Sequence, residues 1–123
     1  MLRKNPDPKC VGILKKIETG EIQGFISTIT AFELYYGAYL FHDTCKAINS
    51  LNKLLLIFKV LDLPIQVSMS AGRIGAELKN KGLEIDFRDL LIGATALNNN
   101  LKLVTLNKKH FSRVDNLEII EMR

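Results

Sequence analysis

The segment that most constrains the fold of this 123-residue chain is Asp86-Phe87-Arg88-Asp89-Leu90-Leu91-Ile92-Gly93-Ala94-Thr95-Ala96. It is predicted to begin a helix, because Asp86 is a favourable N-cap and Asp89 lies in the first turn. Five residues later, residues 101–105 are predicted to form a short buried strand that leads to Asn107. An acidic helix start and a polar strand end thus lie close in sequence, and open α/β sheets bind ligands at the carboxyl ends of their strands.

The rest of the chain predicts an α/β fold with a parallel sheet, because strands alternate with helices. Helices are expected over residues 10–18, 30–41, 43–58, 65–79 and from 86 onward, and strands over residues 24–30, 59–63, 101–105 and 117–121. Residues 108–110 are expected to form a basic loop. The length and the 47% apolar composition fit one domain over residues 1–123.

Two of the predicted helices carry informative patterns. Thr30 is expected to cap the helix 30–41 in a capping box with Glu33 at position N3. The helix 65–79 places four apolar residues on one stripe, which predicts a core face: Val67, Ala71, Ile74 and Leu78.

The charge balance is basic, with 17 Lys and Arg against 13 Asp and Glu, a net charge of +4 and a pI near 9.1. Such an excess suits a polyanion such as RNA, although it is modest. Cys10 and Cys45 match no metal-ligand or redox spacing, which favours reduced thiols and a cytoplasmic protein. The polar start is no signal peptide, and the longest apolar run, residues 54–58, is too short to span a bilayer. We therefore expect a cytoplasmic protein with no membrane partner.

Glu33 and Asp89 each have two interpretations. Each is predicted about one turn into a helix, where the helix dipole stabilises a carboxylate and the side chain can bond back to the N-cap amide. Taken singly, this structural interpretation is the commoner one for such a residue.

The functional interpretation requires the side chains to converge. If strands 24–30 and 101–105 are parallel, Glu33 and Asn107 face one crevice, and Asp89 reaches it from the preceding helix. We then expect their side-chain oxygens within about 10 Å of each other, close enough to share an ion and its waters. Oxygen ligands without His or Cys suit Mg²⁺ or Mn²⁺. Such ions activate water and neutralise charge at a phosphodiester under attack.

Other candidate residues are less specific. His110 could act as a base or contact a phosphate, although a surface histidine beside an inward-packing Phe111 is the commoner case. Tyr35, Tyr36 and Tyr39 favour a core or dimer face over an RNA-stacking platform. The sequence contains no GxGxxG, P-loop, HExxH or GxSxG motif, so dinucleotide, NTP, zinc-protease and esterase chemistry lack support.

Three segments together resemble the PIN domain of VapC-type toxins. Residues 26–38, Ile-Ser-Thr-Ile-Thr-Ala-Phe-Glu-Leu-Tyr-Tyr-Gly-Ala, resemble the family's strand and acidic helix, whose Glu is a metal-site carboxylate. Residues 81–96 resemble the segment that holds its next essential Asp, and residues 103–111, Leu-Val-Thr-Leu-Asn-Lys-Lys-His-Phe, resemble its closing motif. The match covers nearly all of the chain in the right order and spacing.

The resemblance implies a three-layer PIN-like domain and an Mg²⁺-dependent (or Mn²⁺-dependent) endoribonuclease. It implies RNA as substrate, a small antitoxin as inhibitory partner, and a homodimer. Glu33, Asp89 and Asn107 carry over as catalytic and metal-site residues. Asp86 matches no required family position and is expected to be a cap.

One departure from the family pattern bears on activity. The family begins with a central strand ending in Asp-Thr, whose Asp is a principal metal ligand, whereas residues 1–6 here already align after that strand. Asp7 lies on the wrong side of it to serve. We therefore expect a domain that lacks its first strand, with strands 24–30 and 101–105 buried on both faces but missing the neighbour between them.

The departure keeps an alternative open. The chain could be a non-catalytic PIN-fold module that binds RNA or an antitoxin, or a degenerate toxin remnant. Two carboxylates and an amide give a site of low charge. Mg²⁺ gives up its bound waters reluctantly, and such a site offers little to replace them.

Overall fold

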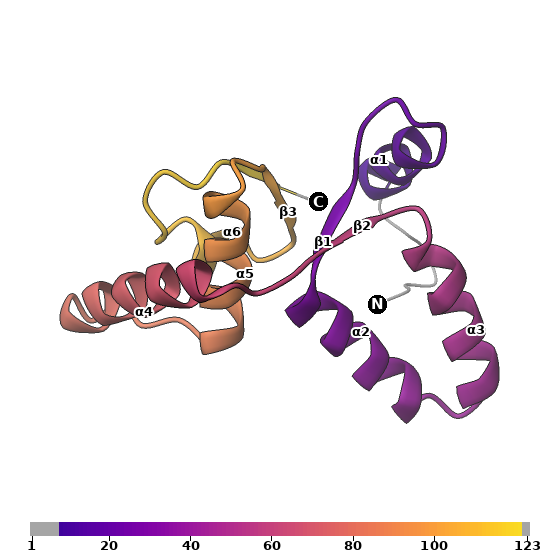
Figure 1. Cartoon of the computed structure of the whole chain (residues 1–123), viewed down its shortest axis with the longest axis horizontal. Helices are drawn as coiled ribbons and strands as arrows, with labels where there is room; N and C mark the ends of the chain where they lie inside the picture. The colour runs from indigo at the N-terminus through magenta and orange to yellow at the C-terminus, as the bar shows by residue number, and fades with distance from the viewer. Residues whose placement is uncertain (1–7, 122–123) are drawn as a thin grey trace. The chain divides into compact units, whose positions relative to one another are not determined.

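The computed structural model describes residues 8–121 and divides the chain into two compact units, Met1–Asp62 (unit 1) and Leu63–Arg123 (unit 2) (Figure 1). The start of the chain, including Asp7, lies outside the described residues. Each unit combines helices with one small parallel sheet, so the predicted α/β class with parallel strands is confirmed.

Unit 1 carries a sheet and a helical hairpin. Its elements are α1 (Pro8–Glu18), β1 (Phe25–Ser27), α2 (Thr28–Leu40), α3 (Thr44–Leu55) and β2 (Lys59–Leu61). Strands β1 and β2 pair in parallel, with Ile26 opposite Val60. The consecutive helices α2 and α3 pack against each other (Figure 1), and a hydrogen bond of 2.6 Å from Tyr35 Oη to Asn52 Oδ1 joins them.

The start of α2 differs from the prediction. The N-cap is Ser27, whose Oγ accepts a hydrogen bond of 3.0 Å from the Thr30 backbone N–H, so the predicted Thr30–Glu33 capping box is wrong. Ser and Thr are both good N-caps, and the earlier of two candidates begins the helix here. The helix therefore takes over β-branched residues that were assigned to the strand, which ends at Ser27.

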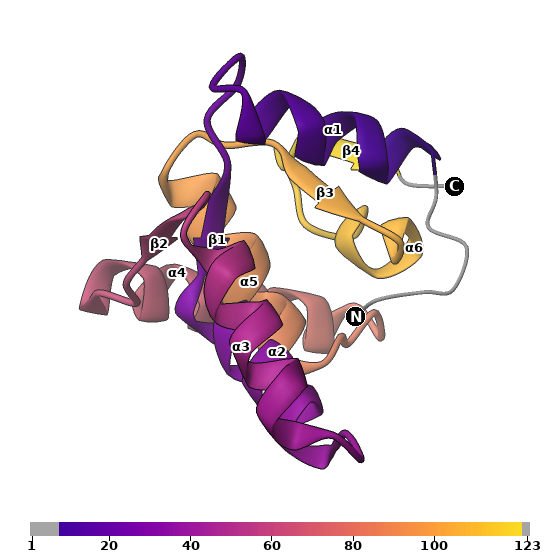
Figure 2. The same cartoon turned by 90° about the vertical axis from the view of Figure 1, so that its right-hand side faces the viewer.

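Unit 2 carries two packed helices and the second sheet. Its elements are α4 (Ile65–Asn80), α5 (Phe87–Asn98), β3 (Leu103–Thr105), α6 (Lys108–Phe111) and β4 (Ile119–Glu121). Strands β3 and β4 are parallel, and β3 leads directly into α6 (Figure 2). The expected basic loop at residues 108–110 is wrong, because these residues form the one-turn helix α6, whose Phe111 is only 4% exposed.

The core of unit 2 lies along α4 and α5. The predicted stripe of α4 is buried as expected, and Ala94 of α5 is fully buried against it. A second cluster joins α4 to the loop between α4 and α5 and to the loop between α6 and β4: Ile74, Leu78, Ile85 and Val114. This core fixes the position of α5, which carries Asp89.

The sheets are smaller than expected. Among the described residues each has two strands, so β1 and β3 belong to separate sheets. The expectation that both strands are buried on both faces is wrong, because Phe25 and Ile26 are only half-buried and Val104 is 41% exposed. A two-stranded sheet leaves each strand with fewer neighbours than a central strand of a larger parallel sheet has.

Candidate metal centre

The start of α5 is fixed by Asp86 rather than by Asp89. The Asp86 carboxylate accepts a hydrogen bond of 3.4 Å from the Arg88 backbone N–H and one of 3.0 Å from the Arg88 guanidinium, as the N-cap prediction requires. Desolvation acts to raise the pKa of Asp86, but the hydrogen bonds and the charge of Arg88 outweigh it and lower that pKa. Asp86 is therefore engaged at the helix terminus, as expected of a cap.

Asp89 occupies position N3 of α5 and does not cap the helix. Its side chain is 21% exposed, and its one polar contact among the described residues is with His110. The hydrogen bond back to the N-cap amide that the structural interpretation requires is not formed within this part of the chain. The Asp89 carboxylate is therefore not engaged by its own helix and faces His110 instead.

Asn107 lies between β3 and α6, at the N-cap position of that short helix. Its backbone N–H donates to Thr105 Oγ1 at 2.9 Å, and its side chain forms no capping bond to the helix backbone. Instead, Asn107 Nδ2 lies 2.9 Å from Nδ1 of His110, which occupies position N3 of α6. The N-cap and N3 side chains of one helix turn are thus brought together.

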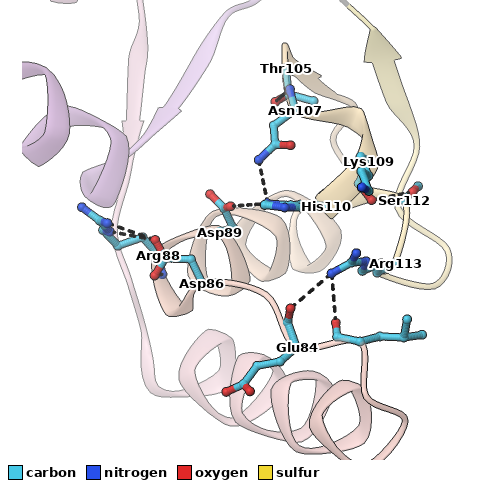
Figure 3. A network of polar contacts seen from close by, with 11 residues as sticks. Glu84, Asp86, Arg88, Asp89, Thr105, Asn107, Lys109, His110, Ser112 and Arg113 are labelled. Carbon is cyan, nitrogen blue, oxygen red and sulfur yellow. Dashed lines mark hydrogen bonds and ion pairs between the residues drawn. The ribbon is translucent and has the colours of Figure 1, made fainter.

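His110 connects the two predicted ligands (Figure 3). Its Nδ1 lies 3.6 Å from Asp89 Oδ2 and 2.9 Å from Asn107 Nδ2, so one atom neighbours both side chains. Asp89 and Asn107 therefore lie within the distance that a shared ion and its waters would require. Their role as metal ligands stays a prediction.

Glu33 belongs to unit 1 and lies in the second turn of α2, where its side chain is half-buried. Because Ser27 is the N-cap, α2 has no acidic residue in its first turn, and the capping interpretation of Glu33 does not hold. Its convergence with Asp89 and Asn107 also stays a prediction.

The donor atoms in unit 2 fit a hard or borderline divalent cation. Asp89 offers carboxylate oxygens, and Asn107 Oδ1 has no hydrogen-bond partner among residues 8–121. Within the described part of either unit, no three His, Cys, Asp or Glu side chains gather into a metal-binding group. Unit 2 therefore brings one carboxylate, one amide and one imidazole close together.

The sequence suggested His110 only as a possible base or phosphate contact, and not as a neighbour of Asp89 and Asn107. The signal was the Asn-x-x-His spacing, which places two side chains at N-cap and N3 of one helix. A helix of four residues is too short for hydrophobic periodicity to reveal, so this segment was expected to be a loop. The inward packing of Phe111 was predicted correctly.

The tyrosines of α2 divide into two kinds. Tyr35 bonds to α3, whereas Tyr36 and Tyr39 are 61% and 64% exposed, so a core role is wrong for these two.

Among the described residues, no helix has the length and apolar character needed to cross a bilayer.

A sequence model of the PIN domain matches residues 2–117. The chain belongs to the PIN-domain family. It is 35% identical over 92 residues to Ribonuclease VapC2 of Rickettsia felis, covering 75% of this chain and 69% of that protein. It is also 32% identical over 94 residues to the tRNA(fMet)-specific endonuclease VapC of Salmonella typhimurium, covering 76% of this chain and 71% of the relative.

The structures agree with this membership. The crystal structure of VapBC2 from Rickettsia felis, bound to a DNA fragment from its promoter, matches this PIN domain with a TM-score of 0.86 and 29% identity. That match covers 98% of this chain and 89% of the other. The predicted resemblance to VapC-type PIN proteins is therefore confirmed.

Proposed function

We propose that this PIN-domain chain is a divalent-metal-dependent endoribonuclease of a toxin–antitoxin pair that hydrolyses RNA phosphodiester bonds. The observation that carries the proposal is Asp89, a carboxylate whose side chain is 21% exposed and whose one polar contact among the described residues is with the His110 ring at 3.6 Å. The oxygens of such a carboxylate are available to coordinate a cation.

Asp89 and Asn107 would hold Mg²⁺ or Mn²⁺, and Glu33 would supply a second carboxylate. Such an ion, when bound, lowers the pKa of a coordinated water and neutralises charge on a phosphodiester. The chain's own contribution is to position the donors. The buried face of α5 fixes Asp89, and the buried Phe111 fixes α6 next to Asn107. Donors that are held in place by packing need less reorganisation on binding.

The proposed partners follow from the similar proteins. Relatives named ribonucleases support RNA as the substrate, and the similarity to VapBC complexes supports a small antitoxin as the partner. A homodimer and a cytoplasmic location complete the proposal. The net charge of +4 is compatible with a polyanionic substrate.

Metal binding and RNA cleavage by the purified chain test the proposal. Mn²⁺ binding is measured by calorimetry and cleavage with a fluorescent RNA, using wild type, Asp89→Asn and Glu33→Gln. Asp89→Asn is expected to weaken Mn²⁺ binding and to lower cleavage by about a hundredfold or more, since several kcal/mol of charge stabilisation are lost.

Asp115→Asn is the matched control, because it makes the same chemical change at an exposed position of unit 2. It should leave both measurements unchanged. Equal Mn²⁺ binding by wild type and Asp89→Asn would show that this centre holds no ion. An unchanged Glu33→Gln variant would remove Glu33 from the site.

A second candidate is a non-catalytic PIN-fold module that binds RNA or an antitoxin. The observation that favours it is the small donor set, in which neither unit by itself gathers three His, Cys, Asp or Glu side chains among its described residues. This candidate predicts RNA binding without cleavage at any Mn²⁺ concentration, and the same experiment separates it from the enzyme.

A further inference from the structure

His110 has two ring nitrogens in different surroundings. Nδ1 faces Asp89 and Asn107, whereas Nε2 has no hydrogen-bond partner among the described residues. A neutral imidazole carries its proton on one nitrogen and a lone pair on the other. In the neutral tautomer that has its lone pair on Nδ1 and its proton on Nε2, the Asn107 amide donates to Nδ1 at 2.9 Å.

This tautomer places two electron-rich atoms, His110 Nδ1 and Asp89 Oδ2, opposite each other. The Nδ1 lone pair lies 3.6 Å from Asp89 Oδ2, which is too long for a hydrogen bond. An electropositive group between the two atoms would stabilise both. The Asn107 side chain lies beside both atoms, with its Nδ2 at 2.9 Å from His110 Nδ1 (Figure 3).

The spacings suit shared coordination. Two ligands bound at right angles, each about 2.1 Å from an octahedral ion, lie about 3 Å apart, and tetrahedral ligands lie about 3.4 Å apart. The contacts of Nδ1 are 2.9 Å to the Asn107 amide and 3.6 Å to Asp89. Rotation of the amide by 180° would replace Nδ2 by Oδ1, an atom that can coordinate a cation.

We propose that His110 Nδ1 is a third metal donor, with Asp89 Oδ2 and Asn107 Oδ1, and that it makes the centre prefer transition metals such as Mn²⁺ and Co²⁺ over Mg²⁺. The preference follows because imidazole is a softer ligand than a carboxylate or an amide oxygen, and Mg²⁺ takes oxygen ligands and retains its waters. The inference rests on the proposed function, since it assigns a ligand to the same centre.

Two substitutions separate the nitrogen donor from the ring. His110→Phe keeps a ring without a donor, and His110→Asn replaces the nitrogen with an amide oxygen at a similar position. His42→Phe is the matched control, because His42 is the other of the two histidines in the chain. It lies exposed in unit 1, beside the Phe41 ring, with ring centroids 4.4 Å apart.

The measurements are the dissociation constants of Mn²⁺ and Mg²⁺ by calorimetry and the visible absorption spectrum of bound Co²⁺. Both His110 variants should bind Mn²⁺ about tenfold more weakly or worse. They should bind Mg²⁺ about as well as wild type, and their Co²⁺ spectrum should shift. The His42 variant should match wild type. A melting curve by circular dichroism establishes that each variant is folded. If His110→Phe does not fold, the test is made with His110→Asn alone.

The possible failures are distinct. If Mn²⁺ binds wild type, but the Mn²⁺/Mg²⁺ preference and the Co²⁺ spectrum survive in His110→Asn, His110 is no ligand and the proposed function stands. If no divalent ion binds wild type, or Asp89→Asn binds Mn²⁺ equally well, the proposed metal centre fails and the assignment of His110 fails with it.

Discussion

The two units differ in how they bury apolar side chains. Unit 2 has a core in which Val67 is 1% exposed and Ala94 is fully buried. In unit 1, α1 and α2 contain no buried residue, and α3 buries only Leu51. The contrast indicates that local stability is unequal and that the helices of unit 2 are the better-supported part of the structure.

The apolar surface of α2 shows the difference most clearly. Phe32, Tyr36, Tyr39 and Leu40 follow helical spacing and are all more than half exposed. Asp89, in contrast, lies on a helix whose interior positions are buried. Asp89 is thus carried by a well-packed helix, the kind of support on which side chains are held most precisely.

The largest expected difference in the free energy of unfolding is between variants of two leucines near helix ends. Leu78 of α4 is 5% exposed and Leu40 of α2 is 71% exposed. Leu78→Ala should lower the free energy of unfolding by about 2–5 kcal/mol because it creates a cavity, whereas Leu40→Ala should change it by less than about 0.5 kcal/mol. Urea unfolding of both variants measures the difference. A comparable loss in both would mean that Leu40 is covered in solution.

The sequence predicted unit 2 better than unit 1, for a physical reason. The apolar stripe on α4 places one buried residue on each of four successive turns. Gly82, with φ +70°, follows the end of that helix as expected. In unit 1 the signals compete. Ser27 and Thr30 are both good caps, and β-branched residues favour strands although they begin α2 here.

The candidate site was predictable only in part. The closeness of Asp89 and Asn107 follows from a helix start and a strand end in one unit. The closeness of His110 to Asp89 and Asn107 could not be predicted without knowing that residues 108–111 form a helical turn. The position of Glu33 depends on contacts between distant parts of the chain, which local pattern does not specify.

A smaller difference in stability is expected between variants of the two N-cap residues, Ser27 of α2 and Asp86 of α5. Ser27 is buried and accepts from Thr30 N at 3.0 Å, whereas Asp86 is exposed and accepts from Arg88 N at 3.4 Å. Ser27→Ala should cost about 1–2 kcal/mol, and Asp86→Ala about 0.5–1 kcal/mol. Thermal unfolding followed by circular dichroism provides the comparison. The reverse order would indicate that the start of α5 is more important for stability than that of α2.

The Asp86 cap also has a pH dependence. Its pKa is lowered in the folded protein, so the stabilisation by its charge is complete above the ordinary aspartate pKa and is lost as the pH falls through the lowered value. Asp86→Asn should therefore be less stable than wild type at neutral pH and should approach it in acid. A stability difference that grows on acidification would contradict this sign.

The smallest expected difference in stability is between Gly→Ala variants of two helical glycines. Gly93 of α5 is buried, and a Cβ there would lie 3.6 Å from both Phe111 and Leu117, which is ordinary contact. Gly37 of α2 is exposed, and a Cβ there would meet nothing within 4 Å. Each Gly→Ala change should gain about 0.5–1 kcal/mol from helix propensity. Gly93→Ala should gain up to about 0.8 kcal/mol more by burying a methyl group.

Gly75→Ala is the contrasting control in unit 2, because its Cβ would lie 2.8 Å from Leu90 Cδ1 and would force that side chain to move. It should be less stable than Gly93→Ala, since overpacking offsets the gain in helix propensity. Calorimetric melting of the three variants measures these differences. If Gly37→Ala stabilises more than Gly93→Ala, α2 takes part in the cooperative transition as fully as α5, and the inequality between the units that exposure suggests would not hold.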